Sequence, residues 1–117
     1  MVCTRVDDDR ETALDRVRDG HDEFWKFLGP YGWSRGYMGP DGKPSPPGLI
    51  PSLEESLENR TWICGSADDV AEGIAAYAEE LGGLENLVLF PAMLGDRYDD
   101  VAEQLERIAN DVLPQLH

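Results

Sequence analysis

The sequence of 117 residues has few of the side chains that usually carry metal or covalent chemistry, with only two cysteines and two histidines. Cys3 and Cys64 each stand alone in a short apolar run, and neither has a histidine near it in the sequence. A zinc site needs about four nitrogen or sulfur ligands. The sequence therefore predicts no metal site and two buried, inert thiols in a reducing compartment, with a disulfide as the alternative.

Basic residues are also scarce, because 10 Lys and Arg face 24 Asp and Glu and give a formal charge of −14. Such a charge disfavours nucleic-acid phosphates and anionic membranes as partners. No apolar run approaches the roughly 18–20 residues that span a bilayer, and we expect no signal peptide at the N-terminus. The chain is predicted to be a single cytoplasmic domain over residues 1–117, with no membrane or nucleic-acid partner.

Recognisable catalytic motifs are missing as well: there is no Gly-x-Gly-x-x-Gly, no phosphate-binding loop and no nucleophile elbow. No catalytic residue is assigned for this reason. Asp7, Asp8 and Asp9 are candidate oxygen ligands for Mg²⁺ or Ca²⁺, but their place before a helix favours helix capping. His21 lies on the apolar face of that helix, where a hydrogen-bonded core histidine is the favoured interpretation over a general base.

Hydrophobic periodicity predicts an α/β chain with parallel strands. Residues 2–6 are rich in β-branched side chains and predict a strand, and the near-continuous apolar run 84–90 predicts a strand buried on both faces. Capping signals at Ser52 and Ser66 start two helices. The predicted helices cover residues 10–28, 52–59, 67–81 and 98–113, the last with Val101, Leu105, Ile108, Ala109 and Val112 facing inward, and residues 61–64 are a short extended candidate.

Residues 29–51 differ in kind, because they hold six of the twelve glycines and six of the eight prolines. Between them stand Trp33, Arg35, Tyr37 and Met38. A loop of this length is uncommon in a compact domain unless it is functional or mobile.

Four successive segments, residues 62–72, 80–90, 98–101 and 112–114, resemble the C-terminal segment of bacterial luciferase-like flavin-dependent monooxygenases. The opening strand and the aspartates after it resemble that family's penultimate strand. Ala67 stands where the family commonly has proline, a change that a helix start tolerates. Family members are (β/α)8 barrels, so the resemblance implies a partial barrel of the last two βα units, with two or three parallel strands and residues 29–60 as a lid-like insertion.

The resemblance also implies a chemistry, in which reduced FMN or the deazaflavin F420 oxidises a small organic substrate, often with O₂. It would place Phe90 and Met93 near the flavin, at the end of the last strand, although core packing is the favoured interpretation of Phe90. Trp33, Arg35, Tyr37 and Met38 would belong to the substrate lid, or else pack against a neighbouring surface. Arg60 would meet a phosphate, or else remain solvated.

Two functional hypotheses follow. In the first, the chain is a C-terminal fragment or truncated member of the flavin-dependent family and is inactive alone, so the isolated chain binds FMN weakly or not at all. In the second, it is a non-catalytic α/β association module that forms a homo-oligomer or completes another subunit. The right-handed crossover rule predicts that residues 2–6 and 84–90 pair in parallel with helix 67–81 packed across them, and an antiparallel pairing would rule out the barrel segment. The open edges of this two-stranded unit also predict that the chain is not a stable monomer, and that a homodimer or higher oligomer forms through the strand edges or the aromatic loop around Trp33 and Tyr37.

Overall fold

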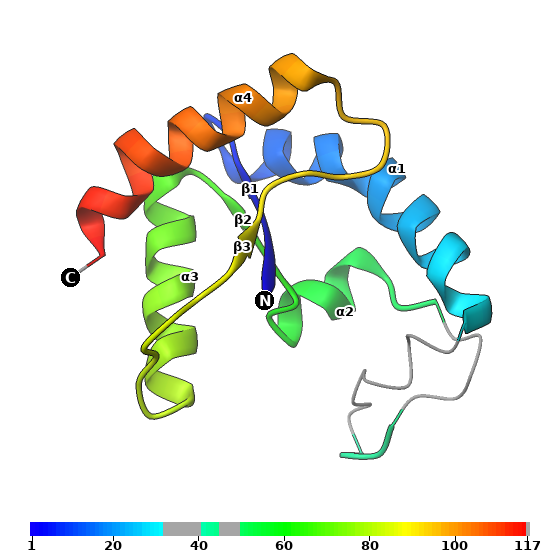
Figure 1. Cartoon of the computed structure of the whole chain (residues 1–117). Helices are drawn as coiled ribbons and strands as arrows, with labels where there is room; N and C mark the ends of the chain where they lie inside the picture. Colours follow the sequence, from blue (N-terminus) through cyan, green and yellow to red (C-terminus); the bar gives the residue numbers. More distant parts are fainter. Residues whose placement is uncertain (32–40, 45–49, 117) are drawn as a thin grey trace.

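The computed structural model describes residues 1–31, 41–44 and 50–116, and its centre is an open sheet of three parallel strands (Figure 1). β1 (Val2–Val6) lies between β2 (Trp62–Gly65) and β3 (Leu89–Phe90), so the order is β2-β1-β3. Cys3 stands opposite Trp62 in one pair and opposite Phe90 in the other. The α/β class and the parallel pairing of the first and last strands are confirmed.

The helices begin where the capping residues predicted. Asp9, Ser52 and Ser66 each accept a hydrogen bond from a backbone N–H in the first turn, and Ser52 and Ser66 form full capping boxes. No helix in the described part of the chain is long and apolar enough to cross a membrane. The helices are α1 (Arg10–Leu28), α2 (Leu53–Glu58), α3 (Ala67–Glu80) and α4 (Tyr98–Arg107), with short turns η1 (Gly29–Tyr31), η3 (Ile108–Val112) and η4 (Leu113–Gln115).

Side chains of β1 alternate between two hydrophobic clusters, one on each face of the sheet, as a pleated strand requires. Val2 and Val6 pack with residues of α3 and η3, whereas Cys3 packs with residues of α1 and α2. All five residues of β1 are buried. The molecule therefore has three layers, with helices on both faces of the sheet (Figure 1).

This arrangement differs from the expected segment of a barrel. In a (β/α)8 barrel, strands that follow one another in sequence are neighbours, and the helices form a ring on the outer face only. Here β2, predicted only as a short extended segment, occupies one edge of β1, so the later strand takes the other edge. An open sheet with a central first strand and helices on both faces is the doubly wound arrangement.

The last strand is shorter and more exposed than predicted. Only Leu89 and Phe90 of the apolar run pair with β1, and the side chains of Val88 and Phe90 are 61% and 41% exposed. Burial on both faces is therefore wrong for this segment. Pro91 follows at once and has no N–H to continue a ladder, which explains the early end of β3.

The inward face of α4 also needs correction. Leu105, predicted to face the core, is 56% exposed, while its neighbour Gln104 is fully buried. Ile108 and Val112 are buried as predicted. The orientation of α4 is fixed by hydrogen bonds of Gln104 rather than by apolar periodicity alone.

Candidate functional site

Three aspartates follow β1 at the carboxyl edge of the sheet, where open α/β sheets usually bind ligands. Asp9 caps α1 by accepting hydrogen bonds from the backbone N–H and the hydroxyl of Thr12, and these bonds lower the pKa of Asp9. Asp7 is buried with its Oδ2 3.0 Å from Nη1 of Arg16, and Oδ1 of Asp8 lies 3.0 Å from Nη1 of Arg107. The capping interpretation is confirmed, and within the described ranges no group of three or more His, Cys, Asp and Glu is placed to hold a metal.

A buried glutamine occupies the same edge on the side of β3. Nε2 of Gln104 donates to the carbonyl oxygen of Val6, and the N–H of Val6 donates to Oε1 of Gln104, both at 2.8 Å. β1 pairs with β3 only at Val2 and Cys3. The backbone N–H and carbonyl oxygen of Val6, further along β1, are therefore hydrogen-bonded by the side chain of Gln104 instead of by a strand. Gln104 fills the point between β1 and β3 where a phosphate-bearing ligand would approach a sheet of this order.

Phe90 and Met93 lie at the carboxyl end of β3, as the sequence placed them. Phe90 is part of the exposed edge, so core packing is the wrong interpretation of it. Met93 packs against the hydrophobic cluster that Cys3 forms with residues of α1 and α2. It lies so close to α1 that a Cβ added at Gly20 would be only 2.6 Å from Cγ of Met93. The backbone N–H of Met93 donates to Oδ2 of Asp96 at 2.7 Å, and Nη1 of the buried Arg5 lies 3.5 Å from the same oxygen.

His21, Cys3 and Cys64 lie in the core. His21 is fully buried, with Nε2 2.8 Å from Oγ of Ser56 and Nδ1 3.1 Å from Oδ1 of Asp22. Cys3 and Cys64 are buried free thiols, which confirms that prediction and not the disulfide. Burial raises the pKa of Cys3 to about 11 and that of Cys64 to about 12, so neither thiol is a nucleophile near neutral pH.

The candidate lid residues Trp33, Arg35, Tyr37 and Met38 lie outside the described residues. Arg60, the candidate phosphate contact, is engaged within the chain. Its guanidinium contacts both carboxylate oxygens of Glu80, with Nη2 2.7 Å from Oε1 and Nε 3.0 Å from Oε2, and this pairing raises the pKa of Arg60. Arg60 thus ties the turn before β2 to the end of α3.

The outer edge of β3 is unpaired among the strands that the structure describes. The N–H of Val2 donates to the carbonyl oxygen of Val88 at 2.9 Å. In a parallel ladder alternate residues face one neighbour, so the backbone groups of Leu89 face away from β1. Residues 86–95 contain no charged side chain, so this edge combines free backbone groups with exposed Val88 and Phe90.

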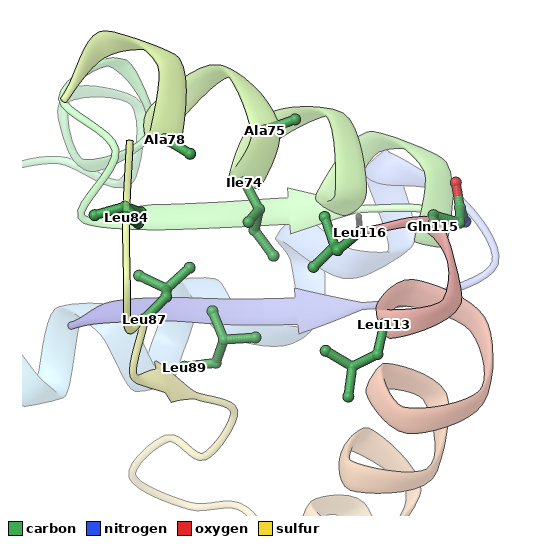
Figure 2. Close-up of a pocket in the computed structure, with 9 residues that line it drawn as sticks. All are labelled: Ile74, Ala75, Ala78, Leu84, Leu87, Leu89, Leu113, Gln115 and Leu116. Atoms are coloured by element: carbon green, nitrogen blue, oxygen red, sulfur yellow. The ribbon is translucent and has the colours of Figure 1, made fainter. Parts of the chain in front are cut away.

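An apolar groove of about 460 Å³, open to solvent, lies on the α3 face of β3, opposite the face that carries Val88 and Phe90 (Figure 2). Leu87 and Leu89 point into it from the β3 segment, Ile74 from α3, and Leu113 and Leu116 from the C-terminal turn. Leu113 remains 49% exposed. The described residues that line the groove are Ile74, Ala75, Ala78, Leu84, Leu87, Leu89, Leu113, Gln115 and Leu116.

The chain segments that form this groove carry charged residues of one sign only. Residues 61–96, which supply α3 and β3, contain no lysine or arginine, and residues 108–116 contain none either. The first of these segments carries seven acidic residues, namely Asp68, Asp69, Glu72, Glu79, Glu80, Glu85 and Asp96. The groove is therefore an apolar surface built from segments of acidic composition, although Glu80 is paired with Arg60 and Asp96 with Arg5.

Comparison with known proteins does not assign the chain to a family. No protein-family model matches the chain, and no curated protein matches it.

Sequence reasoning missed the groove and Gln104. Leu84, Leu87 and Leu89 of the groove belong to the run that the pattern assigned to a fully buried strand, and no role was predicted for Leu113 and Leu116. Gln104 is a polar residue in an amphipathic helix, where exposure is the ordinary expectation. One signal was available, because the absence of basic residues over residues 61–96 is visible in the sequence.

Proposed function

We propose that this chain is a non-catalytic association module whose β3 edge pairs with another polypeptide segment, in the first instance a second copy of itself. One observation carries the proposal: the backbone groups of Leu89 face outward beside the exposed side chains of Val88 and Phe90. Unpaired strand edges with apolar side chains are templates for association.

The two edges of the sheet differ in the charge of the residues beside them, and this difference indicates which edge pairs with another polypeptide. The outer side of β2 borders a small cavity of about 120 Å³ whose lining includes Arg10, Arg60 and Asp69. Charged side chains at a strand edge oppose pairing with another strand. Since residues 86–95 carry no charge, the β3 edge is the favoured docking side.

The second candidate is the C-terminal part of a luciferase-like flavin-dependent oxidoreductase. It is supported by the parallel pairing of β1 and β3 and by the position of Phe90 and Met93 at the carboxyl end of β3. In this case the segment that pairs with β3 belongs to the rest of a barrel, and FMN or F420 binds only to the completed assembly. The order β2-β1-β3 and the helices on both faces favour the association module.

Sedimentation velocity at low micromolar concentration tests the association. We expect a species larger than the 13.0 kDa chain, and we expect Val88→Lys to shift it to the monomer because a lysine at the edge opposes strand pairing. Leu105→Lys is the matched control, because Leu105 is equally exposed but lies on α4. A folded wild-type monomer, or equal effects of the two substitutions, would overturn the proposal.

A further inference from the structure

The groove on the α3 face of β3 offers a second surface, and its chemistry narrows what can bind there. Among the described residues that line it, only Gln115 has a polar side chain, and its Nε2 already donates to Oδ1 of Asp68 at 3.0 Å and to the carbonyl oxygen of Asp111 at 2.8 Å. Specific small-molecule sites orient their ligand through a few convergent polar groups. Both bonds use the amide nitrogen, so Gln115 can offer a ligand its Oε1 acceptor alone, and the groove therefore favours an occupant with a mainly apolar surface.

The shape of the groove fits a helix. Ala75 and Ala78 lie three residues apart on α3, hence on one face of that helix, and both line the groove. Small side chains allow the axes of packed helices to come close, near the lower end of the usual 8–10 Å range. Figure 2 shows Leu87 and Leu89 on the side of the groove across from α3, and the C-terminal turn with Leu113 and Leu116 at one end, beside Gln115.

Acidic residues occur in the chain next to both ends of the groove. Gln115 at one end is bonded to Asp68 and to the backbone of Asp111, and Leu84 at the other end precedes the exposed Glu85. A second copy of this chain carries a net charge of −14 and would place like charges against these carboxylates. The complementary partner carries basic residues at the ends of an apolar stripe.

We propose that this groove binds an amphipathic helix of a different polypeptide, with apolar residues at helical spacing and lysine or arginine at its ends. The inference deepens the proposed association role by naming a partner class. It concerns the opposite face from Val88 and Phe90, so the two surfaces can be tested separately.

A fluorescein-labelled synthetic helix of about 16 residues, with leucines at i, i+3, i+4 and i+7 and lysines at both ends, is the probe. Fluorescence anisotropy with the full chain should show saturable binding with a dissociation constant on the order of 10 µM. A matched peptide with glutamates in place of the lysines should bind at least about tenfold more weakly, and raised salt should reduce the difference. Equal binding of the two peptides, or no saturable binding, would overturn the proposal.

Substitutions locate the binding. Leu113→Lys places a charge on the groove wall and should weaken binding about tenfold, whereas Leu105→Lys, an equally exposed leucine outside the lining, should leave it within about twofold. The double substitution Glu85→Lys with Asp111→Lys should weaken binding of the lysine peptide by about threefold to tenfold. Equal effects of Leu113→Lys and Leu105→Lys would contradict the groove as the site.

The edge variant separates this inference from the proposed function. Val88→Lys should abolish self-association and leave peptide binding unchanged, because Val88 does not line the groove. Peptide binding without self-association of the wild type would refute the edge proposal alone. Self-association without peptide binding would refute the groove proposal alone.

Discussion

The side-chain amide of Gln104 forms a closed pair of hydrogen bonds with the backbone of Val6, each 2.8 Å long, and so takes the place of a neighbouring strand. β3 pairs with β1 only at Val2 and Cys3, so the last residue of β1 would otherwise bury two unpaired backbone groups. The same contact turns α4 so that Leu105 faces solvent. The side chain of Gln104 thus supplies the hydrogen-bond partners that β1 lacks at its carboxyl end, and the same contact sets the orientation of α4.

Gln104→Met should lower the free energy of unfolding by about 2–5 kcal/mol, because it leaves the N–H and the carbonyl oxygen of Val6 buried without partners. Urea denaturation at neutral pH measures the change. Glu106→Gln, two residues away on the exposed side of α4, is the control and should change stability by no more than about 0.5 kcal/mol. A small effect of Gln104→Met would show that the hydrogen-bond pair does not hold the edge.

Local signals in the sequence predicted the helices well. Asp9, Ser52 and Ser66 fix helix starts through hydrogen bonds to residues three positions ahead, which are contacts within reach of short-range reasoning. The order of the strands depends instead on which segment reaches each edge of β1. Residues 61–64 were predicted only as a short extended segment, because four residues carry too little pattern to assign a strand or its neighbour, so the pairing of β2 with β1 was not predicted.

The functional surfaces were less predictable for a related reason. A buried apolar strand and an exposed apolar edge have the same composition, and only the position of neighbouring elements distinguishes them. Gln104 is recognisable only once α4 lies against the end of β1. Phe90 was placed correctly at the strand end, but its exposure follows from the absence of a further described strand beside β3.

Cys3 and Cys64 should resist thiol reagents in the folded chain. Their pKa values, raised by burial to about 11 and about 12, keep both thiols protonated at pH 8. Labelling with a chromogenic disulfide reagent should be slow in buffer and fast in denaturant. Rapid labelling of either thiol in the folded state at pH 8 would show that the core around β1 opens.

The same two thiols predict a stability change at alkaline pH. Their folded-state pKa values lie above the unfolded value of 9.0, so unfolding releases protons above that pH and stability falls as pH rises from about 9 toward 11 and 12. Below pH 9 the thiols are protonated in both states and contribute no slope. Cys64→Ala should show a shallower decline than the wild type when unfolding is measured between pH 8 and 11, and an equal decline would contradict this assignment.

The isolated chain should bind FMN weakly or not at all. The carboxyl edge of the sheet presents Asp7, Asp8 and Asp9 rather than a glycine-rich turn, and Gln104 fills the space beside Val6. Quenching of flavin fluorescence on titration with the purified chain measures the affinity. A dissociation constant in the low micromolar range would contradict this account and favour a flavin site within these residues.

Hydrogen exchange at two adjacent amides tests the central claim, pairing through the β3 edge, most directly. The N–H of Leu89 faces away from β1 and the N–H of Phe90 faces toward it. We expect the Leu89 amide to be protected from exchange in a manner that increases with protein concentration, while protection of Phe90 stays constant, and we expect Val88→Lys to remove the protection of Leu89 only. Fast exchange of Leu89 at every concentration, beside a protected Phe90, would contradict the association module.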